Sequence, residues 1–343
     1  MREDKSVSLV IPGKNSEKTI RQCLESVAGL LKTREVREIL YVDDGSSDGT
    51  MRIAQEFPVR CVQGGGRGPG AARNVGWQAA VSPLIWFVDS DCVARPDALR
   101  ILCEHLADAA VAGAGGSYDN MCPESLLASI IHEEIIARHA AMPTEVNHLG
   151  SFNVLYRRSV LKQLGGFDEK FFSGPNSPGA EDAELSYRLV DAGYALHFDQ
   201  RSRVGHFHPT EFKRYLRAQL HHGYWRTNLY LRYPRRGGGD SYTSLADNIQ
   251  PPLAMALIPA FVAGLFRPGA RDLAFVLTLV LAILQLPMTI KVIEQTGDKK
   301  YGYYALIGFI RAFARGIGMS QAALEFALRK IRPIGKEPAN PAR

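Results

Sequence analysis

Short apolar strands that end in polar turns alternate with helical segments near the N-terminus, and this alternation constrains the fold most. The runs VSLVI at 7–11, REILYV at 37–42 and LIWFV at 84–88 are rich in β-branched and aromatic residues, as buried strands are. Helical spacing follows over 16–31, and a further helix is predicted over 71–80. Strands that alternate with helices of 10–15 residues predict an α/β fold with a doubly wound, mostly parallel sheet.

Aspartate pairs follow two of the predicted strands at the point where each strand ends. Asp43 and Asp44 follow the run at 37–42, and Asp89 and Asp91 follow LIWFV. Because ligands of such sheets lie at the carboxyl ends of the strands, we expect all four side chains in one crevice. Two carboxylates one residue apart can hold Mg²⁺ or Mn²⁺, which prefer oxygen ligands and bridge to substrate phosphates. Alone, each pair also fits a polar turn, and the first would cap the next helix.

A glycine-rich loop at 64–70 precedes the helix predicted from residue 71. Glycines let the backbone approach a ligand closely, and the N-terminus of the following helix favours phosphate. Arg67 and Arg73 can add charge-assisted contacts. No Gly-Lys-Ser/Thr follows, which excludes a Walker A motif, and the loop does not follow the first strand as a dinucleotide-binding fingerprint does.

Two further candidate sites lie later in the chain. Glu181 and Asp182 open a helix predicted to end near residue 192. They are either an acidic pair favoured by the helix dipole or a general base for an attacking hydroxyl. His206 and His208 follow a short strand, and one of them is expected to complete a metal site; a structural role is the alternative.

In their order along the chain, these segments resemble the inverting glycosyltransferases of family 2. The matching motifs are VSLVIPGKN at 7–15, VDDGSSDGT at 42–50, GPGAARN at 68–74, FVDSD at 87–91, LGGFD at 164–168 and the Glu181-Asp182 pair. Each motif is weak alone, but the combination is specific, and the resemblance covers about residues 5–226. It implies a GT-A fold, a nucleotide-diphosphate sugar as donor, and Mn²⁺ or Mg²⁺ as cofactor.

The resemblance also implies catalytic and metal-binding roles. Asp91 matches the principal metal ligand, Asp89 contacts the metal or the ribose, and His206 aligns with a histidine that some members place near the metal. Asp182 matches the catalytic base and Glu181 its acidic neighbour. The implied reaction is a single displacement in which Asp182 deprotonates the acceptor hydroxyl while the cation stabilises the leaving diphosphate.

The donor site follows from the same resemblance, with Asp44 matching the residue that binds the nucleobase. The residues assigned to nucleotide-sugar binding are Pro12, Lys14, Asn15, Asp43, Asp44, Arg67, Arg73, Asp89 and Asn153. Many members carry tyrosine where this chain has Lys14, so Lys14 offers the nucleotide a cation in place of a stacking ring. The loop at 173–179 is expected to act as a lid that orders when the donor binds.

The C-terminal part differs from the rest in charge and hydropathy. Residues 1–200 carry 20 Lys+Arg against 27 Asp+Glu, whereas residues 201–343 carry 21 against 8. Uncharged runs at 251–266 and 273–290 approach the roughly 20 apolar residues that span a bilayer, and 301–328 has the one-sided pattern of an interfacial helix. We therefore expect contact with an anionic membrane surface; a buried helical subdomain is the alternative.

These features predict an organisation for the chain. The expected units are a GT-A domain at 1–232, a linker at 233–250 and a helical, membrane-associated region at 251–343. No segment of signal-peptide type opens the chain, and its five cysteines form no CxxC pair, so we expect the catalytic domain in the cytoplasm.

The expected function is transfer of one sugar to a lipid-linked or polysaccharide acceptor. LHHG follows Gln219, so the Gln-x-x-Arg-Trp motif of processive synthases is absent. A sugar-nucleotide pyrophosphorylase is one alternative, but it leaves the apolar runs unexplained. A non-catalytic nucleotide-sugar-binding membrane protein is another, but it needs no base beside a metal site. Nucleic acid is not expected as a partner, because apolar runs interrupt the basic part.

Overall fold

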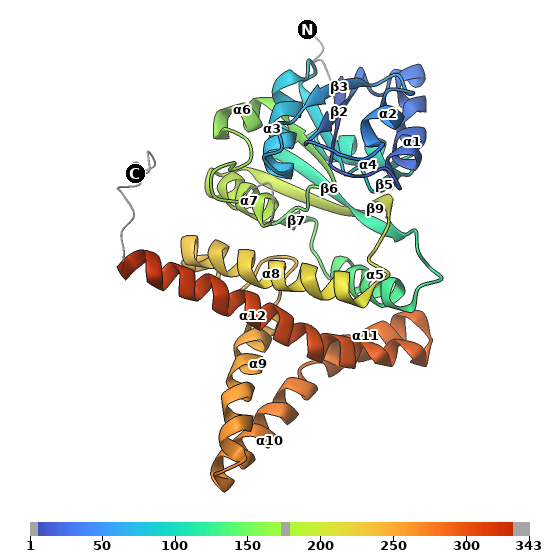
Figure 1. The fold of residues 1–343 in the computed structure, drawn as a ribbon. Coiled ribbons are helices and arrows are strands. Elements are labelled where there is room, and N and C mark those ends of the chain that lie inside the picture. The colour runs from blue at the N-terminus through green and yellow to red at the C-terminus, as the bar shows by residue number, and fades with distance from the viewer. Residues whose placement is uncertain (1–5, 173–178, 332–343) are drawn as a thin grey trace.

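The computed structural model describes residues 6–172 and 179–331, and it consists of an α/β part and a C-terminal helical part (Figure 1). The predicted lid at 173–179 falls almost wholly outside the described residues. The strands of the sheet are β1 Val7–Gly13, β2 Glu38–Asp43, β3 Arg60–Gln63, β4 Leu84–Val88, β5 Cys92–Ala94, β6 Val111–Asn120, β7 Glu145–Val146, β8 Asn153–Arg157 and β9 Ala195–His206. The α-helices are α1 Ile20–Thr33, α2 Thr50–Ala54, α3 Pro69–Ala79, α4 Ala98–His105, α5 Leu126–His139, α6 Arg158–Leu164, α7 Glu181–Asp191, α8 Phe212–Arg232, α9 Leu245–Gly264, α10 Pro268–Ile283, α11 Leu286–Thr296 and α12 Tyr304–Ile331.

The N-terminal half of the sheet is parallel, as the sequence predicts. β1 lies between β2 and β4, and β3 extends the sheet beyond β2. Every residue of β1 and β4 is buried because helices cover both faces, which explains their largely apolar sequences. Leu9 belongs to the core on the face covered by α1, whereas its neighbour Val10 packs with α3 on the other face. The α/β class is confirmed.

Beyond β4 the sheet is mixed. β8 pairs antiparallel with both β4 and β6, and β6 runs parallel to β9. The sequence analysis does not predict β6, which contains Gly113, Gly115 and Gly116, because glycine in a strand weakens the pattern. A Cβ at Gly113 would overlap the ring of Tyr156 on β8, so this close strand contact requires glycine.

A layer of helices separates the sheet from the far end of the molecule (Figure 1). α8 packs along α12, and α11 contacts α5. α8 and α12 touch backbone to backbone at two glycines: a Cβ at Gly223 would overlap the carbonyl of Arg315, and one at Gly318 would overlap the carbonyl of Leu220. Small residues therefore fix how closely these two helices approach.

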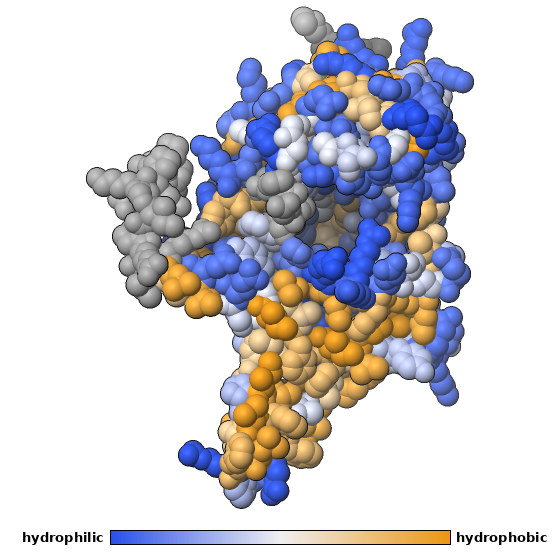
Figure 2. Space-filling view, in the orientation of Figure 1, coloured by the Kyte–Doolittle hydropathy of each residue, from blue (hydrophilic) through white to orange (hydrophobic). Residues whose placement is uncertain are grey.

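α9 and α10 extend from this layer as a hairpin whose surface is largely hydrophobic (Figures 1 and 2). The exposed large apolar side chains over 258–283 are Ile258, Phe261, Val262, Leu265, Phe266, Leu273, Phe275, Val276, Leu279, Val280 and Ile283. Arg267, Arg271 and Asp272 are exposed around the turn at the tip. The helix expected over 273–290 is divided, because α10 ends at Ile283 and Pro287 lies in the first turn of α11.

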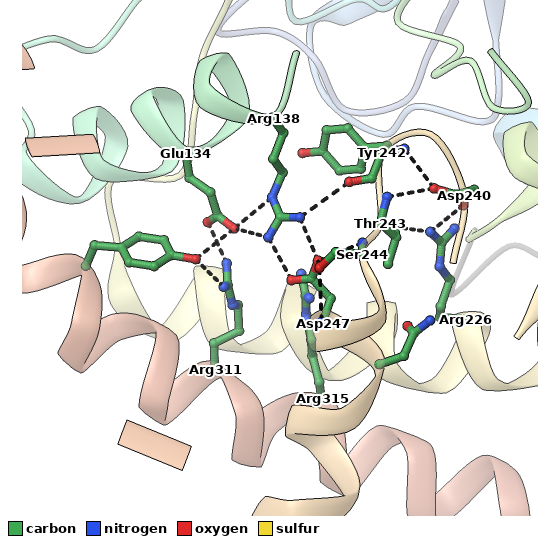
Figure 3. Close-up of polar contacts among 12 residues, drawn as sticks. Glu134, Arg138, Arg226, Asp240, Tyr242, Thr243, Ser244, Asp247, Arg311 and Arg315 are labelled. Atoms are coloured by element: carbon green, nitrogen blue, oxygen red, sulfur yellow. Dashed lines mark hydrogen bonds and ion pairs between the residues drawn. The ribbon is translucent and has the colours of Figure 1, made fainter. Parts of the chain in front are cut away.

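A buried polar network joins α5 to α9 and α12 (Figure 3). Glu134 of α5 accepts hydrogen bonds from Arg138, Arg311 and the hydroxyl of Tyr304. Arg138 also pairs with Asp247 of α9 at 2.7 Å. Burial alone would raise the pKa of Glu134, but Arg311 and Arg138 outweigh it and lower the pKa to about 2. Glu134 therefore holds two helices of the C-terminal part against α5.

We expect Glu134→Ala to lower the free energy of unfolding by about 3–5 kcal/mol, because it leaves the buried Arg311 without its carboxylate and removes one of the two carboxylate partners of Arg138. The measurement is denaturant unfolding in detergent micelles. Glu133→Ala is the matched control, since the carboxylate of Glu133 bonds Gln295 at the surface. Equal stability of the two variants would contradict this account of the network.

Candidate active site

The carboxyl ends of β1, β2 and β4 open into a cleft of about 1330 Å³. The cleft gathers most of the residues that the sequence assigns to the site, which come from the end of β1, the acidic turns after β2 and β4, α3, the start of α7 and the end of β9. They are Pro12, Lys14, Asn15, Asp44, Arg73, Asp89, Asp91, Glu181, Asp182 and His206.

Three assigned residues lie outside the lining of this cleft. Asp43 is buried, and its carboxylate accepts hydrogen bonds from the hydroxyl of Tyr41 and the N–H of Ser46. Asn153 is fully buried on β8 and accepts from the indole of Trp86. Arg67 is exposed and pairs with Glu169 at 2.6 Å. The contacts of Asp43 and Asn153 organise the backbone next to the cleft.

Asp44 fastens the glycine-rich loop to the end of β2. Its two carboxylate oxygens accept hydrogen bonds from the backbone N–H groups of Arg67 and Gly68, at 2.9 and 2.8 Å. Gly68 has φ of +99°, which favours glycine at this position before α3. A carboxylate has about four acceptor positions, so Asp44 keeps capacity for a further donor on its cleft side.

Arg73 connects the two acidic motifs. Its buried guanidinium donates to Asp89 at 2.7 Å and to Glu181 at 2.9 Å. Burial alone would lower the pKa of Arg73, but Asp89 and Glu181 outweigh it and raise the pKa above its ordinary value. The sequence analysis expects Arg73 at a phosphate, whereas the structure places it between two carboxylates that lie far apart in the chain.

Glu181 and Asp182 form the first turn of α7, so both carboxylates lie near the helix N-terminus. Burial raises the pKa of Glu181 to about 7, and the neighbouring charge of Asp182 adds to this effect. Asp182 is partly exposed in the cleft, where one carboxylate oxygen accepts the N–H of Ala183. The cleft therefore contains one carboxyl group poised to titrate near neutral pH and one that is accessible to a ligand.

His206, at the end of β9, faces the aspartate motif. Its Nε2 lies 3.5 Å from Oδ2 of Asp91, and its Nδ1 lies 3.0 Å from Nδ1 of His208. Burial alone would raise the pKa of Asp91, but His206 outweighs it and lowers the pKa. His208 is buried and contacts His132 of α5, which the sequence analysis misses. Of the two candidate histidines, His206 is therefore the one beside Asp91.

The family resemblance implies a divalent cation at Asp89 and Asp91, and the chemistry of these residues fits one. Among the residues described, no three or more His, Cys, Asp or Glu side chains are arranged to enclose a metal. A nucleotide-bound Mg²⁺ or Mn²⁺ needs no such cage, because one or two carboxylates, water and substrate phosphates hold it. Two aspartates one residue apart, with His206 beside Asp91, match that requirement.

Several residues that line the cleft belong to no sequence motif and were not predicted. Tyr118 of β6 stacks on Phe152 with ring centroids 3.6 Å apart, and both line the cleft. His222, Arg311 and Arg315 line its far end. Both arginines lie in the segment 301–328, whose sequence predicts only an interfacial helix. Their spacing of four residues, which places them on one helix face, was the available signal.

An α/β sheet with acidic turns after β2 and β4, and an acidic helix start in the same cleft, defines a domain of the GT-A type. Residues 8–165 match the family model described as Glycosyl transferase family 2, and the chain belongs to this glycosyltransferase family.

Curated relatives are similar over part of their length. The pre-mycofactocin glycosyltransferase of Mycobacterium tuberculosis is 27% identical over 250 residues, which cover 67% of this chain and 48% of that protein. Glycosyltransferase AglE of Haloferax volcanii is 26% identical over 199 residues, covering 56% of this chain and 64% of that protein. The chain thus spans about half to two thirds of the length of these relatives.

A solved mannosyltransferase from Pyrobaculum calidifontis, in complex with GDP-Man and Mn²⁺, shares the fold. Its TM-score is 0.54 at 17% identity, and the match covers 97% of this chain and 88% of that chain. The similarity therefore includes the C-terminal helices as well as the sheet.

The raised pKa of Glu181 predicts a pH-dependent stability. Folding favours the protonated carboxyl group, so its contribution is complete below about pH 4.5 and is lost as the pH rises through about 7. Relative to Glu181→Gln, the wild type should lose roughly 3 kcal/mol of unfolding free energy across this window. Unfolding curves at several pH values measure this difference.

Asp191→Asn at the exposed end of α7 is the control, and it should follow the wild type across the same pH range. A constant difference between wild type and Glu181→Gln from pH 4.5 to 7 would show that Glu181 has an ordinary pKa.

Proposed function

We infer that this chain is an inverting glycosyltransferase that moves one sugar from a nucleotide-diphosphate sugar to an acceptor hydroxyl. The observation that carries this proposal is the bridge that Arg73 makes between Asp89 and Glu181. It brings the motif suited to a cation and diphosphate into the same cleft as the acidic start of α7. Family membership supports the same reaction class.

In the proposed reaction, Asp182 takes the proton of the acceptor hydroxyl as that oxygen attacks the anomeric carbon. Asp89, Asp91 and His206 would hold the divalent cation, Mn²⁺ or Mg²⁺, which supplies Lewis-acid stabilisation of the leaving diphosphate. Arg73 orients Asp89 and Glu181 and balances their charge. Asp44 and Lys14 line the part of the cleft proposed for the nucleoside.

The donor class has support from a structural relative. The Pyrobaculum calidifontis mannosyltransferase of the same fold was solved with GDP-Man and Mn²⁺. A nucleotide-diphosphate sugar is therefore the donor proposed here. A sugar-nucleotide pyrophosphorylase and a non-catalytic nucleotide-sugar-binding protein, the two alternatives considered from sequence, are not favoured by any contact in the cleft.

The hairpin supports association with a membrane. Phe266 is 82% exposed and Phe275 is 70% exposed, and neither has a protein surface to cover it within the described residues. The stretch Pro268–Thr296 has the length and hydropathy of a span, and only 22% of its most apolar window is buried by the protein. The stretch is divided between α10 and α11. We propose that the hairpin inserts in the bilayer while the catalytic domain remains in the cytoplasm.

The geometry of the hairpin favours entry and return on one side of the membrane. α9 begins, and α10 ends, at the helical layer below the sheet (Figure 1). The 16 residues of α10 extend about 24 Å, against about 30 Å for the hydrocarbon core. Arg267 and Arg271 at the tip reach further with their long side chains, toward the far headgroups of a locally thinned bilayer. A lipid-linked or polysaccharide precursor at this surface is the proposed acceptor.

We expect Asp182→Asn to bind nucleoside diphosphate with Mn²⁺ like the wild type and to lose about 10²–10⁴ in kcat, because general-base help is removed. Asp91→Ala should instead lose metal-dependent nucleotide binding. Calorimetric titration and release of nucleoside diphosphate from a panel of nucleotide sugars measure the two effects. Asp191→Asn, on the same helix as Asp182, controls for charge; turnover by Asp182→Asn near the wild-type rate would rule out the base assignment.

The double variant Phe266→Asp/Phe275→Asp should detach the protein from vesicles. Burial of each aromatic side chain contributes about 1.5–3 kcal/mol, so partitioning should fall by at least about a hundredfold. Vesicle flotation measures it, and Val81→Asp, which changes an exposed apolar residue of the catalytic domain, is the control. Flotation of the double variant at the wild-type level, or wild-type protein that stays soluble without detergent, counts against insertion.

A further inference from the structure

The cleft extends beyond the proposed catalytic residues to the base of the hairpin. Its lining continues through Gln219 and His222 of α8 to Arg315 of α12 and Asp247 of α9. Burial and the charge of Arg315 lower the pKa of His222 to about 4, whereas Asp182 opposes this shift. His222, Asp182 and Arg315 therefore belong to the lining of one continuous cleft.

The buried network at the base of the hairpin contains more guanidinium groups than carboxylates (Figure 3). Three arginines have carboxylate partners: Arg138 with Glu134 and Asp247, Arg311 with Glu134, and Arg226 with Asp240. Arg315 is the fourth, and the three carboxylates of this network already bind the other arginines. The charges of this network therefore do not balance.

Arg315 accounts for the imbalance. Its Nε donates to Oε1 of Gln219 at 2.8 Å, and within the described residues no carboxylate oxygen lies within 4.0 Å of its guanidinium. The two oxygens of Asp247 instead accept from Arg138 and Ser244. Burial and the charge of Arg311 lower the pKa of Arg315 below its ordinary value. A cation in such surroundings is costly unless an anion pairs with it.

The backbone of Arg315 has a fixed place beside the cleft. Gly223 of α8 packs directly against the carbonyl of Arg315, so the two helices leave no room to move the residue away from the cleft. The apolar surface of α9 and α10 begins below α12, the helix that carries Arg315 (Figures 1 and 2). A ligand that satisfies both surroundings carries an anionic group on an apolar chain.

We propose that Arg315 binds the phosphate group of a lipid-anchored acceptor, whose apolar chain follows the hairpin and whose nucleophilic oxygen reaches toward Asp182. The proposal rests on the proposed function, because only a glycosyltransferase makes this molecule an acceptor. A guanidinium suits phosphate because its planar N–H groups form two parallel hydrogen bonds with phosphate oxygens. Within the described residues, the guanidinium of Arg315 makes one hydrogen bond, from Nε to Gln219, and none from its Nη groups. The Nη groups are therefore the donors proposed for phosphate.

The test compares binding to neutral phosphatidylcholine vesicles that contain either polyprenyl phosphate or the uncharged polyprenol, in the presence of EDTA so that no cation recruits phosphate to the aspartates. We expect wild-type protein to prefer the phosphate vesicles and Arg315→Gln to lose about tenfold or more of this preference. Arg315→Lys should retain part of it. Arg217→Gln, an exposed residue of α8 outside the cleft, should behave as wild type.

Inorganic phosphate distinguishes a lipid phosphate from free phosphate. Weaker binding of inorganic phosphate than of polyprenyl phosphate, by at least about tenfold, supports a lipid-anchored ligand; equal binding overturns it. The proposal also fails if Arg315→Gln keeps the full preference for phosphate vesicles, or if the wild type has none. Binding of nucleoside diphosphate with Mn²⁺ to Arg315→Gln checks that this variant is folded.

Kinetics separate this inference from the proposed function. For transfer to a sugar hydroxyl of polyprenyl-phosphate-linked acceptors, Arg315→Gln should raise the acceptor KM about tenfold with a smaller change in kcat. An unchanged KM would overturn the role of Arg315 while the glycosyltransferase activity stands. If the wild type binds lipid phosphate through Arg315 but transfers no sugar from any nucleotide sugar, the proposed function fails and the phosphate site remains.

Discussion

The buried ion pairs of Arg73 are the interaction on which the site depends. The guanidinium belongs to α3, yet it contacts the turn after β4 and the start of α7, two segments separated by about ninety residues of chain. Removing the guanidinium would leave both carboxylates without this buried partner, which is more costly than never burying them. The aspartate motif and the acidic pair are therefore placed as one unit, and the cleft owes its composition to this arrangement.

A second buried network serves the helical part. Glu134 and Asp247 pair with arginines so that α5, which follows the sheet strand β6, is joined to the hairpin and to α12. The same helices line the far end of the cleft. The same helices thus contact both the catalytic part and the apolar hairpin. The cleft runs along these helices from the acidic edge of the sheet to the apolar surface.

Much of this structure could be predicted from the sequence. Largely apolar runs identify β1, β2 and β4, and the acidic turns after β2 and β4 identify one side of the cleft. β6 is not predicted because it contains glycines, which have low strand propensity. The structure shows that contacts with neighbouring residues leave no room for larger side chains at these positions. The hairpin return and the position of Arg315 depend on how helices pack, which periodicity does not specify. Asn153 shows the converse: a residue assigned to nucleotide-sugar binding makes its hydrogen bonds inside the sheet.

The contact between α8 and α12 has a consequence for distance. Because Gly223 and Gly318 let the two backbones touch, no layer of flexible side chains separates the helices there. α8 carries His222 on the side of the cleft, and α12 lies next to the hairpin. With the hairpin in a bilayer, the two glycines would act as a spacer of fixed thickness, so the height of the reaction above the lipid would be built into the fold rather than left to thermal motion.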